Sequence, residues 1–117
     1  MSQTDLYETD RVNDIFVIRP LNEEMLLSEL IPTRQDELVQ LIGSSDAPRV
    51  VLDLANIAYM SSTALGLLVT LHKRLAEQSR TFAVCSPQRD IRLVLEITMF
   101  HKLFPIYDSL SAALTAE

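Results

Sequence analysis

Three consecutive hydroxyl side chains, Ser61-Ser62-Thr63, are the residues of this sequence best suited to chemistry. A hydroxyl at the start of a helix can accept a hydrogen bond from an unpaired first-turn N–H, and it can also carry a phosphate. A strongly apolar helical pattern follows directly, so Ser61 or Ser62 is predicted to be the N-cap of that helix. A cap needs one hydroxyl, and three in a row exceed this requirement.

The helix that begins near Ser62 is amphipathic, and its pattern decides which hydroxyl faces the solvent. The side chains predicted to face the core are Ala64, Leu65, Leu67, Leu68, Leu71, His72 and Leu75. The positions left for the solvent are Thr63, Gly66, Thr70, Lys73 and Glu77. Thr63 is therefore predicted to project outward beside Gly66, which has no side chain to block a partner. Glycine costs roughly 1 kcal/mol relative to alanine inside a helix, so a close contact explains Gly66 better than local stability does.

A phosphate on Thr63 would lie at the positive end of the helix dipole, where free N–H groups favour an anion. The modification adds about −1.5 to −2 charges. We expect it to leave the domain folded and to change only what this surface can bind.

The elements around this helix indicate one α/β domain over residues 14–117. Strands are predicted at 15–18, 50–54, 81–85 and 105–107, with a further extended piece over 25–30. Helices are predicted after Pro32 with Thr33 as the cap and Gly43 as a left-handed C-cap, from Ser62 for about fifteen residues, after Pro87, and over 109–114. This alternation, with strands almost free of polar residues, is typical of a mostly parallel central sheet of about four or five strands flanked by about four helices. Residues 1–13 are polar and are expected to form a loosely ordered N-terminal segment.

The composition excludes several classes of protein. Two glycines in 117 residues leave no room for the Gly-rich loops that bind nucleotides. A net charge of −6 without a basic cluster argues against nucleic-acid binding. A single cysteine allows no internal disulfide, and the polar, acidic N-terminus is unlike a signal peptide. Both observations favour a cytoplasmic location. The longest apolar stretch, around 64–71, is far shorter than the ~20 residues of a membrane helix, so no direct membrane insertion is expected.

Other candidate residues give weaker chemical signals. Asp53 stands in an otherwise apolar strand, and since a buried acid needs a partner, a functional and a structural role are both open. His72 and His101 have no further ligand at a useful spacing, so neither a metal site nor a cofactor is expected. If the chain were a hydrolase, Ser62→Ala would abolish its turnover. No Gly-x-Ser-x-Gly elbow is present, so we expect no enzyme and no catalytic residue.

Several apolar residues near the C-terminus are expected to be structural. Cys85 is predicted to fill the core of its strand. A core role at helical spacing is also predicted for Met99, Phe100, Leu103 and Phe104. A groove for a partner is the alternative for these four residues.

The segment around the hydroxyl run resembles the signature of STAS domains. A strand over 50–54, the stretch 57–60 and the run Ser61 to Gly66 at the head of a helix are more narrowly similar to the bacterial anti-sigma-factor antagonists. The motif of that family reads Asp-Ser-Ser-Gly-Leu-Gly after an apolar residue, and the residues that match it without gaps are Met60, Ser62, Leu65 and Gly66. The element order over 14–116 also agrees.

Three positions of the motif differ from the family. Thr63 stands where the family has its phosphorylated serine, Ser61 replaces the aspartate, and Ala64 replaces the first glycine. A threonine can still be phosphorylated. The loss of the acid alters what a kinase can recognise, and Ala64 is expected to add a methyl group where a partner approaches.

The resemblance implies a binding module rather than an enzyme. In that family the unmodified domain binds an anti-sigma factor that is also an ATP-dependent Ser/Thr kinase, and the sigma factor is released. Phosphorylation of the antagonist breaks the complex, and a phosphatase restores it. The resemblance implies Thr63, or Ser62, as the phosphoacceptor, and it implies a partner surface of Ser61, Ser62, Thr63, Ala64, Gly66 and Thr70.

The two departures at Ser61 and Ala64 support a second hypothesis. Here the chain is a non-phosphorylated STAS scaffold or accessory subunit of a stress-signalling or lipid-transport complex. A complex with scaffold or transporter subunits and no kinase would distinguish it from the antagonist.

Overall fold

The computed structural model describes residues 6–22 and 28–116. Their elements, in chain order, are β1 (Tyr7–Val12), β2 (Ile15–Pro20), η1 (Ser28–Leu30), α1 (Ile31–Gly43), β3 (Arg49–Asp53), α2 (Ser62–Glu77), β4 (Thr81–Cys85), α3 (Arg89–Ile97), η2 (Phe100–Lys102), β5 (Ile106–Tyr107) and α4 (Leu110–Thr115). The labels η1 and η2 denote short 3-10 turns. No helix among the described residues is both long enough and apolar enough to cross a membrane.

The five strands form one sheet in the order β1-β2-β3-β4-β5. The β1–β2 pair is antiparallel and the other three pairs are parallel. This confirms the predicted α/β class with a mostly parallel sheet of about five strands and four helices. Because β2 to β5 run in one direction, the segments that leave β2, β3 and β4 start from the same edge of the sheet.

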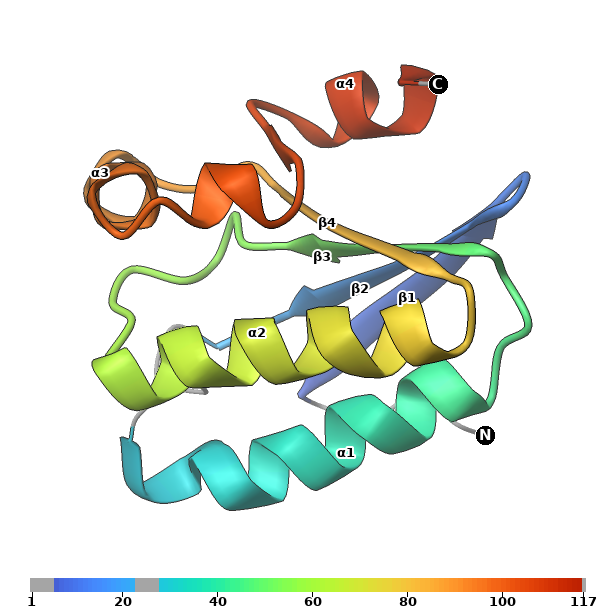
Figure 1. The fold of residues 1–117 in the computed structure, drawn as a ribbon, viewed down its shortest axis with the longest axis horizontal. Coiled ribbons are helices and arrows are strands. Elements are labelled where there is room, and N and C mark those ends of the chain that lie inside the picture. The colour runs from blue at the N-terminus through green and yellow to red at the C-terminus, as the bar shows by residue number, and fades with distance from the viewer. Residues whose placement is uncertain (1–5, 23–27, 117) are drawn as a thin grey trace.

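The helices cover the two faces of the sheet unequally. Helices α1 and α2 lie side by side on one face, and the short α4 lies on the other (Figure 1). Alternate residues of each strand serve the two faces: Val50 and Leu52 join the larger core cluster, whereas Val51 packs in the smaller cluster that contains Ala113 of α4. The central strands are therefore buried on both sides, which explains their unbroken apolar sequences.

Helix α2 is anchored by a continuous apolar stripe. Leu67, Leu68, Leu71 and Leu75 are each at most 1% exposed. Burying a leucine side chain contributes about 1.5–3 kcal/mol, so these residues hold the whole helix on the sheet. The predicted stripe is confirmed for these leucines and Ala64, whereas Leu65 and His72 are only partly buried. The stripe fixes which side of α2 faces the solvent.

The N-terminal segment is the main correction to the expected fold. Residues 7–12 are not loosely ordered, because they form β1 and pair with β2 along its whole length. The Tyr7 side chain is buried, and its hydroxyl donates a hydrogen bond to Glu37 Oε1 of α1 at 2.8 Å. The other side chains of this edge strand are partly or fully exposed, which is why the segment has the composition of a loop.

Both predicted ends of α1 are wrong in detail. The helix begins at Ile31 with Leu30 at the N-cap position and Pro32 in the first turn, so Thr33 is not its cap. Gly43 has no positive φ and is the last helical residue, and the Ser44 hydroxyl donates to Leu41 O at 2.7 Å. Of the extended piece predicted at 25–30, residues 25–27 lie outside the described residues and 28–30 form η1.

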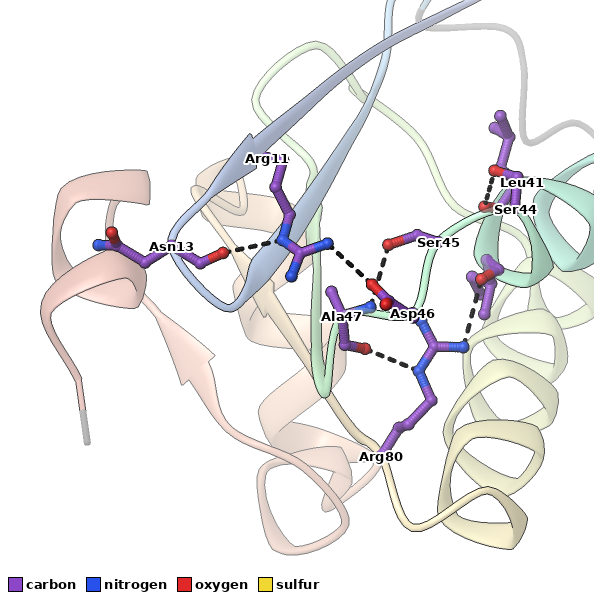
Figure 2. A network of polar contacts seen from close by, with 9 residues as sticks. Arg11, Asn13, Leu41, Ser44, Ser45, Asp46, Ala47 and Arg80 are labelled. Carbon is purple, nitrogen blue, oxygen red and sulfur yellow. Dashed lines mark hydrogen bonds and ion pairs between the residues drawn. The ribbon is translucent and has the colours of Figure 1, made fainter.

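A polar network joins three connections at the amino end of the parallel strands (Figure 2). Arg80, just before β4, donates through Nε to Ala47 O at 2.7 Å and through Nη1 to Ile42 O at 3.2 Å. Arg11 of the β1–β2 hairpin pairs with Asp46 at 3.1 Å. Arg80 thus satisfies carbonyl groups at the end of α1 and in the loop before β3, far along α2 from Ser62.

Residues 99–104 only partly follow the predicted core pattern. Phe104 is buried, with its ring centroid 5.0 Å from that of Phe82, and Phe100 packs against the core. Met99 and Leu103 are 48% and 46% exposed, so their predicted core role is wrong. The reason is the left-handed backbone of Met99, with φ of 67°, which ends the helical repeat after α3.

Candidate functional site

The loop between β3 and α2 carries the hydroxyl run and is held from both sides. Leu54 and Ile57 are fully buried and Met60 is nearly so, which places an apolar anchor at every third residue. The backbone N–H of Leu54 donates to Cys85 O of β4 at 2.9 Å, and the Gln88 side chain donates to Ala55 O at 3.0 Å. These contacts fix where α2 begins.

Ser61 is the N-cap of α2. Its backbone is extended, with φ −75° and ψ 168°, and its Oγ accepts a hydrogen bond from the Ala64 N–H at 3.1 Å. Its carbonyl accepts the first helical bond from the Leu65 N–H at 3.0 Å. The side chain is 7% exposed. Of the two predicted candidates for the cap, the structure selects Ser61, and the other two hydroxyls are not used for capping.

The first turn of α2 presents Ser62, Thr63 and Gly66 to the solvent. A Cβ built on Gly66 would meet nothing within 4 Å, so packing inside this chain does not require a glycine there. Thr70 is partly exposed, one turn further along, and its hydroxyl donates to Gly66 O at 3.1 Å. These residues form a strip of small residues along the start of the helix.

Two residues of the expected partner surface lie inside the fold. Ala64 is 0% exposed and belongs to the larger core cluster, so its methyl group faces the core and not an approaching partner. Ser61 is buried by its capping role. Ser62, Thr63, Gly66 and Thr70 remain as the surface part of the set.

The helix start is suited to hold negative charge. Within the described part of the chain, no hydrogen-bond acceptor reaches the backbone N–H of Ser62 or of Thr63. These two groups point along the helix axis at its positive end, so an oxyanion on either hydroxyl residue has donors nearby.

Asp53 has a structural role at the end of β3. It is 2% exposed, and its two oxygens accept from Arg19 Nε at 2.9 Å and from the Ala55 N–H at 3.0 Å. Arg19 also pairs with Glu8 of β1. The hydrogen bond to Asp53 raises the pKa of the Arg19 guanidinium. The buried acid is thus fully satisfied, and it ties β2 to the beginning of the site loop.

Cys85 and His72 offer no reactive group at the start of α2. Cys85 is buried as predicted, and burial together with the nearby Asp53 charge raises the pKa of its thiol to about 11. His72 is partly buried with its ring centroid 5.8 Å from that of Phe104. Across the described residues, no three His, Cys, Asp or Glu side chains come close enough together to hold a metal ion.

Sequence reasoning missed a set of exposed apolar residues at this edge of the molecule. Tyr59, in the loop before Ser61, is 59% exposed, and Leu93 and Ile97 of α3 are 54% and 70% exposed. The sequence does carry a signal for this exposure, since Leu93 and Ile97 form an apolar pair four residues apart in α3. The same short helix contains a second apolar pair four residues apart, Ile91 and Leu95, which is buried. The sequence alone does not show which of the two pairs faces the core.

Comparison with known proteins assigns these features to a family. The sequence model of the STAS domain matches residues 5–113. An anti-sigma F factor antagonist of Paenibacillus polymyxa is 28% identical over 88 residues, which are 75% of this chain and 73% of that protein. Because the matched family is one of non-enzymatic domains, the match confirms that the chain is not an enzyme.

Solved structures share the fold at low sequence identity. An anti-sigma-factor antagonist (STAS) domain protein from Planctomyces limnophilus matches with a TM-score of 0.79 and 24% identity, over 92% of this chain and 94% of that one. The phosphorylated form of the Bacillus cell fate determinant SpoIIAA matches with a TM-score of 0.66 and 15% identity, over 92% and 96% of the two chains. Family model, sequence relative and structures agree, and the chain belongs to the STAS domain family.

Proposed function

We propose that this STAS domain is an anti-sigma factor antagonist that is switched by phosphorylation of Thr63, with Ser62 as the alternative acceptor. Its partner is a kinase-type anti-sigma factor, which the unmodified domain sequesters. The observation that carries the proposal is the exposed Thr63 at the second position of α2, beside two free backbone N–H groups and a glycine.

The three hydroxyls differ in what they can do. Ser61 is buried and its oxygen is occupied by the cap, so it is a poor substrate for a kinase. Ser62 and Thr63 are both exposed. Thr63 is the preferred acceptor because it stands where the family motif has its phosphorylated serine, and the paired serine before it is also retained.

The switch follows from charge at a surface of small side chains. A phosphate brings about −1.5 to −2 charges, and the free N–H groups of Ser62 and Thr63 stabilise it without any change in the core. In a complex the same charge would be desolvated against the partner, at a cost of several kcal/mol. The existence of a phosphorylated form of SpoIIAA with this fold supports a switch that leaves the domain intact.

The cycle needs few other components. A kinase-type anti-sigma factor adds the phosphate from ATP, a phosphatase removes it, and the domain itself requires no cofactor. A net charge of −6 favours protein partners over nucleic acid. We infer that the domain acts in the cytoplasm without inserting into a membrane.

Phosphate transfer tests the acceptor directly. The chain is incubated with the purified kinase-type anti-sigma factor of its own organism and ATP, and the modified residue is mapped by mass spectrometry. Thr63→Ala should abolish the modification, and Ser62→Ala should leave it.

Ser111→Ala is a matched control for this experiment. Ser111 is exposed at the second position of α4, behind the Ser109 cap, just as Thr63 stands behind Ser61. The control should be modified at Thr63 like the wild-type chain. Absence of phosphate from both Ser62 and Thr63 in the wild-type chain would refute the phosphoswitch.

The scaffold hypothesis remains the second candidate, and Ser61 favours it. Where the family has an acid, this chain has a neutral cap that is buried, so no carboxylate marks the acceptor for a kinase. A stable complex with scaffold or transporter subunits, combined with no phosphorylation, is the result this hypothesis predicts.

A further inference from the structure

We propose that the groove between β1 and α4 is a docking site for a basic, extended segment of a partner protein. The groove has a volume of about 330 Å³, and the residues that line it are Glu8, Thr9, Asp10, Val12, Val17, Arg19, Leu110 and Leu114. It lies on the side of the sheet that carries α4, opposite to α1 and α2 (Figure 1). This inference is separate from the switch at Thr63, because the groove and α2 lie on opposite faces of the sheet.

Strand pairing places the residues of the groove on one face of the sheet. Ile15 and Val17 of β2 pack in the buried cluster that contains Ala113 of α4. Residues paired across neighbouring strands share a face, and the β1–β2 pairs on this face are Val12–Ile15, Asp10–Val17 and Glu8–Arg19. Helix α4 packs mainly against β4 and β5, so a groove is left between it and β1.

Apolar side chains line the groove on its β2 and α4 sides. Val17 of β2 is buried, and Val12 of β1 is partly buried. Leu110 and Leu114 are four residues apart, so they lie on the same side of α4, and both are only partly buried. An aliphatic chain that enters the groove therefore removes apolar surface of these side chains from water.

The β1 side of the groove is negatively charged. Glu8 and Asp10 are exposed, and the guanidinium of Arg19 is shared between Glu8 and the buried Asp53. Asp10 accepts the backbone N–H of Arg11 at 2.8 Å, and no side-chain cation of the described residues pairs with its carboxylate. Lysine and arginine combine an aliphatic stem with a cationic end, so they complement a groove with apolar walls and an acidic rim.

The edge position of β1 favours an extended occupant. In the described part of the chain, β1 is an outer strand of the sheet and pairs only with β2. An edge strand can accept a further strand through its outward-facing backbone groups. Because side chains alternate between the two faces of a strand, every second side chain of such a segment would lie on the α4 side, next to Glu8 and Asp10. Basic residues at alternate positions are therefore the pattern that fits.

The same carboxylates argue against a second copy of this chain as the occupant. Antiparallel pairing of two β1 strands about Thr9 would set Glu8 opposite Asp10 of the copy. Pairing about Asp10 would set the two Asp10 side chains opposite each other. Like charges directly opposite each other destabilise a strand pair, whereas opposite charges stabilise it. A basic segment turns the repulsion into attraction, and the net charge of −6 of the chain favours its approach.

A designed peptide tests the groove by NMR titration of the isotope-labelled full chain at low salt. The probe is acetyl-Lys-Thr-Lys-Thr-Leu-Thr-Lys-Thr-Lys-amide, whose alternate side chains read the same in both strand directions. We expect it to shift the amide signals of β1 and of α4, and the peptide with Glu in place of Lys should leave them unchanged. Glu8→Gln/Asp10→Asn should weaken binding by roughly fivefold, and Asp10→Lys, which removes no ion pair of the chain, by at least as much. Asp36→Asn/Glu77→Gln, which removes two exposed carboxylates from α1 and α2, is the matched control and should bind like the wild-type chain.

Several results would overturn the inference. No shift of β1 signals at millimolar concentrations of the basic peptide would do so, as would equal affinity of the wild-type chain and Asp10→Lys. An equal loss of affinity in the control variant would show that only the net charge of the chain matters. Concentration-dependent shifts of β1 signals without any peptide would identify β1 as a contact between two copies. Because the groove lies away from α2, the groove variants should be phosphorylated at Thr63 like the wild-type chain, and the fate of the proposed switch is therefore decided separately.

Discussion

Removal of the Ser61 hydroxyl should weaken the fold at the site where the switch operates. Ser61 Oγ is the acceptor for the Ala64 N–H at 3.1 Å, and both residues are buried. In Ser61→Ala, water cannot readily replace the lost acceptor, so a buried N–H is left unpaired at a cost of about 1–3 kcal/mol. Measured losses of helix caps are about 0.5–2 kcal/mol, and the two ranges together predict a decrease of about 1.5 kcal/mol in the free energy of unfolding.

Helix α4 provides an internal control for this value. Ser109 caps α4 with the same hydrogen-bond pattern, accepting from the N–H of the residue three positions later, Ala112, at 3.0 Å, but that bond is exposed. Water can take the place of its hydroxyl, so Ser109→Ala should cost about 0.5 kcal/mol, at the low end of cap substitutions. The difference between the two variants isolates the contribution of burial.

Urea unfolding followed by circular dichroism measures both variants. For a domain of this size, 1.5 kcal/mol corresponds to a decrease of roughly 6 °C in melting temperature. Ser61→Asp should recover most of the loss, because aspartate caps a helix as well as serine does. Equal costs for Ser61→Ala and Ser109→Ala would refute the assignment of Ser61 as a buried cap.

Three further substitutions probe the site and its support. Gly66→Ala should raise the free energy of unfolding by up to about 1 kcal/mol, because the added Cβ meets nothing within 4 Å. The affinity for the partner, measured by calorimetry, should fall. A stable variant with unchanged affinity would show that no close contact occurs at this position. Asp53→Asn should lower the free energy of unfolding, measured with urea, by about 2 kcal/mol. This is below the usual cost of breaking a buried ion pair, because Arg19 is partly exposed and retains its ion pair with Glu8. A decrease of less than about 0.5 kcal/mol would contradict the buried pairing. Burial raises the pKa of the Cys85 thiol from 9.0 to about 11, so its contribution to stability is complete below pH 9 and is lost as the pH rises toward 11. Cys85→Ala should therefore flatten the fall in unfolding free energy between pH 8.5 and 10, whereas the part of the fall that comes from the raised pKa of Tyr7 is common to both chains. An unchanged slope would count against this assignment.

The elements with strong apolar patterns were predictable from the sequence. Strand β4 has the predicted bounds, β3 is displaced by one residue, and α2 begins at Ser62 as expected. In each case the residues that specify the element are also those that pack in the core, so local pattern and tertiary burial agree. The solvent side of α2, with Thr63 and Gly66, followed from the same pattern.

The missed features depend on contacts that a local pattern does not encode. Strand β1 is an edge strand of mostly polar residues, and what makes it a strand is its partner β2 and the buried Tyr7. Met99 adopts a left-handed backbone that ends α3, although methionine has no local preference for it. The exposure of Leu93 and Ile97 could not be read from α3 alone, because which side of a short helix is buried depends on the rest of the core.

The binding of the phosphorylated domain tests the central claim most directly. The domain is phosphorylated at Thr63 to completion, and its affinity for the anti-sigma factor is compared by calorimetry with that of the unmodified domain, with Ser111→Ala treated identically as the control. The phosphoswitch predicts that the unmodified domain binds and that phosphorylation weakens binding at least a hundredfold without unfolding the domain. Equal affinity of the two forms would contradict it.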